Sequence, residues 1–176
     1  MRVPDAIDTA RLRLRRHQRK DEAAFVAFMT DEEATRFLLL TAGERTEAGA
    51  RAQFSRALNL YEVAEPIFSL TIADRETDAF VGACGLNPIV EEPAAREIFY
   101  DVIVEQQGKG YAREASEALV DYAMKEAGIP KLVAFLRPEN TRAVAVAEYL
   151  GFEDHGPAMK HGRSGRRYVL SAVKPA

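Results

Sequence analysis

The spacing of apolar residues predicts alternating strands and helices along the chain. In residues 11–15, arginine and leucine alternate with a period of two, which is typical of a strand with one buried face. Apolar residues recur at helical spacing in residues 21–28 and 46–63, which predicts two amphipathic helices. After Pro66 the period returns to two, and the turn-prone residues 74–78 separate two such runs, which predicts a β-hairpin.

The next segment predicts a two-faced strand, a glycine-containing turn and a long helix. Residues 97–104 alternate between two sets of side chains, one containing Tyr100 and the other Glu97. The segment 107–110, with two glycines, breaks this alternation. Apolar residues at helical spacing then continue to about Gly128, where the predicted helix ends.

The last third of the chain predicts a buried strand, a helix and two closing strands. Lys131–Leu136 is short and apolar, as expected of a central strand. A helix is predicted between Asn140 and Gly151, and two strands should flank a loop at residues 162–165. With no linker or internal repeat, we expect residues 1–176 to form one mixed α/β (α+β) domain, with helices covering a single sheet.

Composition excludes several classes of protein. The chain has 176 residues, 47% of them hydrophobic, and a formal net charge of -3. Its mild acidity argues against a nucleic-acid-binding protein. No apolar run approaches the roughly 18 residues of a membrane span, and the start lacks a secretory signal, so we expect no membrane association and a cytoplasmic location. The lone Cys84 rules out an internal disulfide and is expected to be a small buried residue.

The segment from Gln107 to Ala112 is the strongest candidate for a ligand site. Glycines between a strand and a helix let the backbone approach a ligand, and the free N–H groups at the helix start attract anions such as a pyrophosphate. A plain connecting turn has the same local pattern, so the glycines alone leave both interpretations open. The motifs of P-loop and dinucleotide-binding proteins are absent from the sequence.

Several motifs together resemble the GNAT family of N-acetyltransferases. Gln107–Ala112 resembles the Q/R-x-x-G-x-G/A acyl-CoA signature, and Glu97–Tyr100 resembles the E-I-G-Y strand of the branch that acetylates ribosomal-protein N-termini. Pro138–Asn140, Leu150–Phe152 and the opening Thr9–Arg15 are similar to further landmarks of that branch. The resemblance implies the GNAT fold, with a mixed, mostly antiparallel sheet and helices on both faces.

The resemblance also implies where acetyl-CoA, the co-substrate, would bind. The pyrophosphate would lie on the loop and helix start, and Asn140 would contact the pantetheine arm. The strand through Val102, Ile103 and Val104 would be splayed from Lys131–Leu136, so that its free main-chain groups pair with pantetheine. Asn140 is also a plausible helix N-cap, and both roles are compatible. The loop residues implied are Gln107, Gly108, Lys109, Gly110, Tyr111, Ala112 and Arg113.

The chemistry implied is direct attack of an amine on the thioester. Glu97 is the candidate catalytic base, because the matching family position lies beside the acceptor cleft; a solvated or salt-bridged carboxylate is the alternative. Family members place a Tyr or Ser where this chain has Ala147 and Ala143. The proton for the thiolate would then come from water, Tyr100 or Tyr111, or the chain would bind acyl-CoA without efficient catalysis.

The acceptor is left open. The branch resemblance favours a protein N-terminus, and a small amine such as a polyamine or an antibiotic is the alternative; a non-catalytic acyl-CoA sensor is a rival of another class. A homodimer is an expectation from the family alone. His17, His155 and His161 are scattered along the sequence, so we expect surface residues and no metal site.

Overall fold

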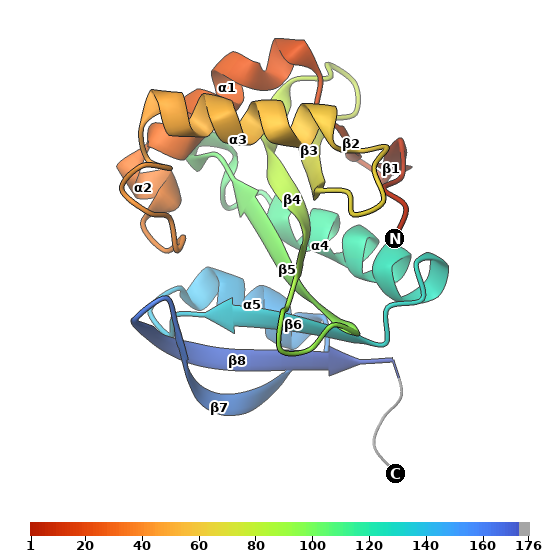
Figure 1. Cartoon of the computed structure of the whole chain (residues 1–176), viewed down its shortest axis with the longest axis vertical. Helices are drawn as coiled ribbons and strands as arrows, with labels where there is room; N and C mark the ends of the chain where they lie inside the picture. Colours follow the sequence, from red (N-terminus) through yellow and green to blue (C-terminus); the bar gives the residue numbers. More distant parts are fainter. Residues whose placement is uncertain (173–176) are drawn as a thin grey trace.

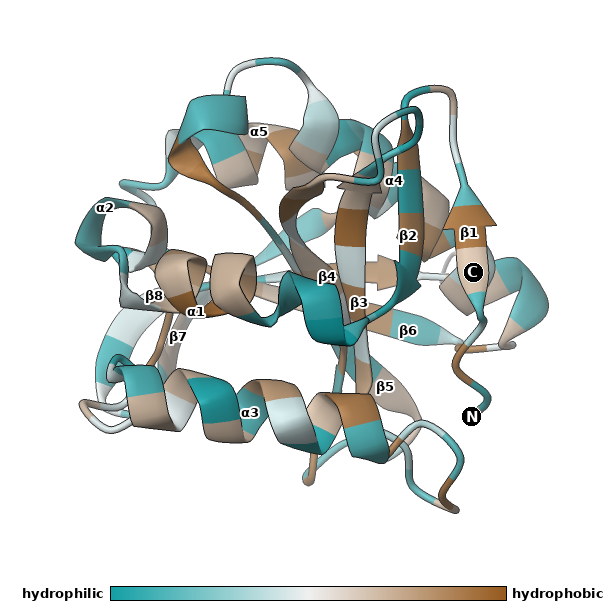
Figure 2. Ribbon diagram, turned by 90° about the horizontal axis from the view of Figure 1, so that it is seen from above, coloured by the Kyte–Doolittle hydropathy of each residue, from teal (hydrophilic) through white to brown (hydrophobic). Residues whose placement is uncertain are grey.

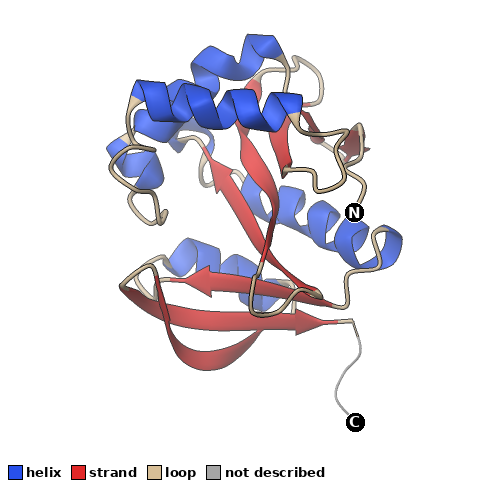
Figure 3. Cartoon of the chain, in the orientation of Figure 1, coloured by secondary structure: helices blue, strands red, loops and turns tan. Residues whose placement is uncertain are grey.

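The computed structural model describes residues 1–172 and contains an eight-stranded sheet with helices on both faces (Figures 1 and 3). The strand order is β1-β2-β3-β4-β5-β6-β8-β7, and all neighbours are antiparallel except the parallel pair β5–β6. The predicted mixed, mostly antiparallel α/β architecture is therefore confirmed. The strands are β1 (Ala6–Asp8), β2 (Leu12–Arg16), β3 (Phe68–Asp74), β4 (Phe80–Pro88), β5 (Ala95–Val102), β6 (Lys131–Leu136), β7 (Glu153–Lys160) and β8 (Arg163–Ser171).

Two groups of helices cover opposite faces of the sheet (Figure 2). On one face, apolar residues of α1 and α3, including Phe25 and Phe54, pack against Ala83 of β4. On the other face, Leu119 of α4 and Ala147 of α5 belong to a larger core with Cys84 and Ile98. The helices are α1 (Glu22–Thr30), α2 (Glu32–Thr35), α3 (Glu47–Asn59), α4 (Tyr111–Asp121) and α5 (Thr141–Tyr149).

The sheet opens between its two central strands. Strand β5 pairs with β6 only from Ala95 to Glu97, which lies opposite Val133. Beyond these pairs the two strands diverge, and Figure 1 shows the gap between them. The predicted splay is confirmed, and it leaves residues 98–102 of β5 without a partner in β6.

Strand β5 ends at Val102 rather than at the predicted Val104. The Ile103 amide donates to Val81 O at 3.0 Å, and Val104–Gln106 then form a short 3-10 helix. The prediction that the strand includes Ile103 and Val104 was therefore wrong. Alternation of side chains cannot reveal this end, because the hydrogen bond that fixes it comes from a distant strand.

Other boundaries also differ from the predictions. Helix α3 ends at Asn59 instead of Val63, because Leu60 leaves the helical conformation and its carbonyl accepts from Ile67. The two closing strands are confirmed, but they meet at a turn formed by His161 and Gly162. Gly165 lies inside β8, where a β-carbon would meet the Phe135 ring at 2.5 Å. Between residues 1 and 172, no helix combines the length and apolar character needed to span a membrane.

His17 corrects another prediction, because it lies in the interior rather than at the surface. Its side chain packs against Phe25 and Phe54, and its ring nitrogens hydrogen-bond Thr71 and Ser69. His155 and His161 are exposed, as predicted. Over residues 1–172, no cluster of three histidine, cysteine or acidic side chains could hold a metal ion.

Candidate functional site

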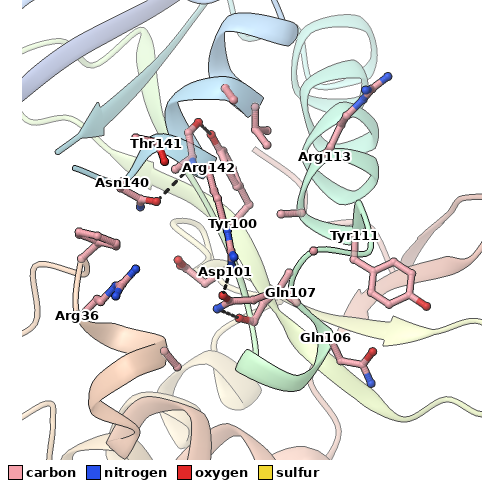
Figure 4. Close-up of a pocket in the computed structure, with 18 of the residues that line it drawn as sticks. Arg36, Tyr100, Asp101, Gln106, Gln107, Tyr111, Arg113, Asn140, Thr141 and Arg142 are labelled. Carbon is pink, nitrogen blue, oxygen red and sulfur yellow. Dashed lines mark hydrogen bonds between the residues drawn. The ribbon is translucent and has the colours of Figure 1, made fainter. Parts of the chain in front are cut away.

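Two cavities meet at the gap between β5 and β6. The first, of about 530 Å³, is lined by residues 106–108 and 110–113 and by the start of α5, and we call it the loop cavity (Figure 4). The second, of about 480 Å³, contains Phe25, Phe28, Phe99 and Phe135 in its wall, and we call it the aromatic cavity. Both cavities share the side chains Phe37, Leu38, Tyr100, Asp101, Asn140 and Ala143.

The start of α4 presents unpaired N–H groups to the loop cavity. Gly108 and Gly110 adopt left-handed backbone conformations, with φ of 76° and 81°. No side chain caps this helix, and its first turn, Tyr111–Arg113, lines the cavity. A β-carbon on Gly108 would meet no atom within 4 Å, so the glycine leaves open space beside the helix end. An uncapped helix N-terminus with free amides and a positive dipole end is suited to bind an anion.

The glycine loop is fixed by a carboxylate at its back. Glu114 of α4 accepts hydrogen bonds from the Thr9 hydroxyl at 2.7 Å and from the Arg11 amide at 2.8 Å, and its other oxygen pairs with the Arg11 guanidinium at 2.7 Å. Burial opposes the ionisation of Glu114, but these donors prevail and lower its pKa. Arg11 also donates to Lys109 O at 2.9 Å and lies over the Tyr111 ring. The N-terminal segment therefore holds the loop in place.

A second anchor joins the loop to β5 and α5. The Gln107 side-chain amide donates to Val102 O at 3.2 Å, and Arg142 donates to Gln107 Oε1 at 2.8 Å (Figure 4). The residues Arg11, Glu114 and Arg142 were not singled out by the sequence. Glu114 follows the glycines at a position typical of an acidic first-turn residue, but its partners lie far away along the chain.

The unpaired edge of β5 exposes main-chain groups to the gap. Hydrogen-bonded and non-hydrogen-bonded pairs alternate along an antiparallel ladder. Ile103 bonds to Val81, so Asp101 and Phe99, two and four residues earlier, also direct their N–H and C=O groups toward β4. The main-chain groups of Tyr100 and Ile98 consequently point the other way, into the gap left by β6.

The structure gathers most of the predicted cofactor residues around the loop cavity. Its lining includes Val102, Gln107, Gly108, Gly110, Tyr111, Ala112, Arg113 and Asn140. Ile103, Val104 and Lys109 do not line it. The Lys109 ammonium group instead donates to Gln106 Oε1 at 2.7 Å. Asn140 Oδ1 accepts from the Ala143 amide at 3.3 Å, which confirms its predicted role as the N-cap of α5.

Glu97 and Asp101 share one face of β5 but differ in their surroundings. Glu97 lines the aromatic cavity and forms an ion pair with Lys160 of β7. Asp101 lines both cavities, and within residues 1–172 its carboxylate has neither a hydrogen-bond donor nor a salt-bridge partner. Burial raises the pKa of Asp101 to about 7. The sequence placed Asp101 on the same face as Glu97, but nothing in it distinguished the unpaired carboxylate from the paired one.

The tyrosines near the gap lie in different positions. Tyr100 borders both cavities, and its hydroxyl donates to Ala143 O at 3.2 Å. Burial raises the pKa of Tyr100, so the phenol stays protonated at neutral pH. The Tyr111 ring, which borders the loop cavity, points away from Tyr100 (Figure 4), and Tyr149 is half exposed with Arg113 stacked on it at 3.4 Å.

Cys84 is buried in the core, as predicted, and is paired with Tyr100 of the neighbouring strand. Burial raises the pKa of its thiol. A buried thiol with a raised pKa is a poor nucleophile at neutral pH, because the reactive species is the thiolate. Cys84 therefore contributes to packing.

Comparison with known proteins agrees with this geometry. The chain is 28% identical over 174 residues to an uncharacterized N-acetyltransferase, p20, from Bacillus licheniformis, and the match covers 97% of each chain. A putative ribosomal-protein-serine acetyltransferase from Vibrio cholerae has the same fold, with a TM-score of 0.76, 19% identity, and 97% and 99% of the two chains covered.

A second solved structure with this fold holds ligands. It is the spermidine N-acetyltransferase from Vibrio cholerae in complex with CoA and spermine, with a TM-score of 0.76, 20% identity, and 93% and 96% of the two chains covered. The family model for the acetyltransferase (GNAT) domain matches residues 11–153. The chain therefore belongs to the GNAT family of acetyltransferases, as its motifs indicated.

Proposed function

We propose that this acetyltransferase moves the acetyl group of acetyl-CoA to a primary amine by direct attack in a ternary complex. The main support for the proposal is the uncapped start of α4, which faces a cavity that shares part of its lining with a second one at the splayed strands. The first cavity offers an anion site for a pyrophosphate, and the second has room for the acceptor. Members of the GNAT family use acetyl-CoA, and the Vibrio spermidine acetyltransferase was solved with CoA.

The residues around the loop cavity fit a long, doubly charged thioester. Amides from Gly108 to Arg113 would bind the pyrophosphate, and Arg36 and Arg142 at the cavity wall would balance its charge. The free main-chain groups of Tyr100 would pair with the pantetheine amides as a neighbouring strand does. Asn140 caps α5 through its oxygen, so its amide nitrogen is left to donate to the same arm.

Positioned groups around the gap would carry out the transfer. An exposed β5 amide would donate to the thioester oxygen and stabilise its negative charge in the tetrahedral intermediate. Tyr100 is placed to give its proton to the departing thiolate, since it borders both cavities and remains protonated. Tyr100 would thus be the acid for which family members use a Tyr or Ser at the positions of Ala147 and Ala143. Tyr111 points away from Tyr100 and Tyr149 stacks against Arg113, so both lie less favourably for this role.

The relatives do not identify the acceptor of this enzyme. The neighbours with this fold include one described as acting on a ribosomal protein and one described as acting on spermidine, so the fold does not distinguish these classes. A protein N-terminus stays the prediction of the motif resemblance. The non-catalytic sensor would bind CoA in the same place and release none from acetyl-CoA. The homodimer and the cytoplasmic location also stay predictions.

Binding of CoA to Gly108→Asp tests the assignment of the loop. Aspartate tolerates the left-handed conformation, and its carboxylate would occupy the anion site at the start of α4. We expect calorimetry to show at least about a tenfold loss of CoA affinity, corresponding to about 1.4 kcal/mol. Gly128→Asp is the matched control, because Gly128 also has a positive φ and open space at its β-carbon but lies outside both cavities.

Equal CoA affinity in both variants would refute the loop assignment. Single-turnover assays of the wild-type protein with acetyl-CoA and a panel of amines then separate the enzyme from the sensor. Amine-dependent release of CoA supports the transferase, whereas tight binding of CoA without release supports the sensor.

A further inference from the structure

One carboxylate at the junction of the two cavities has no partner. Asp101 lies on the face of β5 that it shares with Glu97 and Phe99, opposite Ala83 of β4. That face borders the aromatic cavity, and Figure 4 shows Asp101 among the residues that also line the loop cavity. An amine in the aromatic cavity and a thioester in the loop cavity would meet beside this residue.

The other acidic groups of the aromatic cavity are already engaged. Glu97 is paired with Lys160, and Glu44 accepts a hydrogen bond from the Thr41 amide at 2.8 Å. For Asp101, no donor or cation within residues 1–172 offsets the cost of removing the carboxylate from water. Asp101 is half-buried, and a carboxylate that loses part of its water without gaining a partner is destabilised, so a ligand that supplies the missing donor would bind here favourably.

We propose that Asp101 binds the nitrogen of the acceptor amine and accepts its proton, and that the acceptor carries this single amine on an apolar body. The inference rests on the proposed function. The ammonium form gives one proton to the Asp101 carboxylate. The freed lone pair forms the C–N bond to the acetyl carbon, and the C=O electron pair moves onto oxygen.

Collapse of the intermediate restores C=O and breaks the C–S bond, with the electron pair leaving on sulfur. The thiolate takes one proton from Tyr100, and the nitrogen loses its second proton to solvent, from which Tyr100 is reprotonated. Asp101 releases its proton to solvent after the transfer. The products are the acetylated amine, CoA and one proton.

The walls of the aromatic cavity define the class of acceptor. Phe25, Phe28 and Met29 of α1 face it, together with Phe99 and Phe135 from the sheet. Its charges balance, because Glu44, Glu97 and Asp101 are matched by Arg56, Arg137 and Lys160. A polyamine with several positive charges would need a surplus of carboxylates, which this cavity does not offer. An acceptor with one amine nitrogen at Asp101 and an aromatic or alkyl group against the phenylalanines fits both the apolar wall and the balanced charge of this cavity.

The charge on Asp101 makes the reaction pH-dependent. Its pKa of about 7, raised by burial, means that the carboxylate form is lost as the pH falls through neutrality. The titratable groups near Asp101 in the sheet are Cys84 on the adjacent strand β4 and, on its own strand β5, Tyr100 and Glu97. The cations around the two cavities are Arg36, Arg56, Arg113, Arg137, Arg142 and Lys160. The remaining titratable groups of the linings are Glu33, Glu44, Tyr111, Glu139 and His161.

Steady-state kinetics of Asp101→Asn test the base. With 2-phenylethylamine as acceptor, we expect kcat/KM at pH 8 to fall at least about 100-fold, the range of general-base catalysis. The wild-type profile should show an inflection near pH 7 that this variant lacks, while its affinity for CoA is unchanged. Asp121→Asn, a matched loss of charge on the exposed side of α4, should behave as wild type.

Two further variants make the test selective. The assignment to Asp101 would be overturned if Glu97→Gln or His161→Gln lacked the inflection near pH 7 while Asp101→Asn retained it. An active Asp101→Asn variant with an unchanged profile would do the same and leave the proposed function intact. A wild-type protein that releases no CoA with any amine would overturn the proposed function and this inference together.

A comparison of three amines tests the class of acceptor. We expect kcat/KM for 2-phenylethylamine to exceed the values for ethanolamine and spermidine at least tenfold, because only the first has an apolar body and a single charge. A value for spermidine equal to or above that of 2-phenylethylamine would overturn the assignment of an apolar monoamine. Phe28→Asp should remove the preference for 2-phenylethylamine over ethanolamine; its retention would contradict the role of the aromatic wall.

Discussion

The buried His17 predicts a loss of stability in mild acid. Its side chain is only 3% exposed. Nδ1 lies 2.7 Å from the Thr71 hydroxyl and Nε2 lies 2.9 Å from the Ser69 hydroxyl, so the neutral ring is fully hydrogen-bonded. Burial is the strongest influence and lowers the pKa of His17 to about 4, although the nearby Asp21 carboxylate favours the protonated form.

The magnitude follows from the two protonation equilibria. The folded protein holds the pKa of His17 at about 4, below the ordinary value of 6.5 that applies to the unfolded chain. Between pH 6.5 and pH 4 the imidazole of the unfolded chain binds a proton that the folded protein does not bind. The contribution of neutral His17 to folding stability is therefore intact above pH 6.5 and is lost as the pH falls toward 4. At about 1.4 kcal/mol per pH unit, the loss amounts to about 3 kcal/mol.

Urea unfolding at pH 7 and pH 4.5 measures this loss. Between these two pH values the fall in the free energy of unfolding should be about 2 kcal/mol smaller in His17→Gln than in the wild type, because other groups titrate alike in both proteins and the rest of the loss comes only below pH 4.5. In His155→Gln, a substitution of an exposed histidine, the free energy of unfolding should fall as much as it does in the wild type. An NMR titration of the folded wild type gives the direct test: an imidazole that protonates between pH 6 and 7 would refute the argument from burial.

Two further substitutions test the core and the site. Asp21→Asn removes the buried one of the two carboxylates that pair with Arg15, the other being Asp78, so urea unfolding should show a loss of about 3 kcal/mol. Asp8→Asn, in the exposed pair with Arg13, should cost less than about 1 kcal/mol. Equal losses would contradict the role of burial. Tyr100→Phe removes the proposed proton donor, so kcat should fall at least about tenfold with CoA affinity retained; an unchanged kcat would exclude Tyr100 as the donor.

Local patterns predicted most of the fold because most elements are long and periodic. The alternation in β3 and β5 and the helical spacing in α3 and α4 each extend over seven residues or more. The short elements escaped detection: β1 has three residues and α2 has four, too few to establish a period. Both depend on neighbours, since β1 pairs with β2 and α2 is capped by Asp31.

The candidate site was predictable where it consists of backbone. The glycines before α4 indicated a strand-to-helix turn open to an anion, and the turn has that form. Side-chain roles were less predictable, because Lys109 turns to Gln106 and Glu97 is paired with Lys160, which is 63 residues away. Asp101 and Glu97 share one face of one strand, and only tertiary contacts distinguish them.

The splay of β5 from β6 connects the two halves of the proposed reaction. Pairing stops at Glu97, so the next residues of β5 present free main-chain groups to the gap while their side chains still alternate between the two faces of the sheet. Tyr100 therefore faces α5, where its hydroxyl reaches Ala143 O, and Asp101 faces α1 and the aromatic cavity. In the proposed mechanism, consecutive residues supply the proton donor for the thiolate and the proton acceptor for the amine. Because they lie on opposite faces, the acid and the base stay apart while the thioester lies between them.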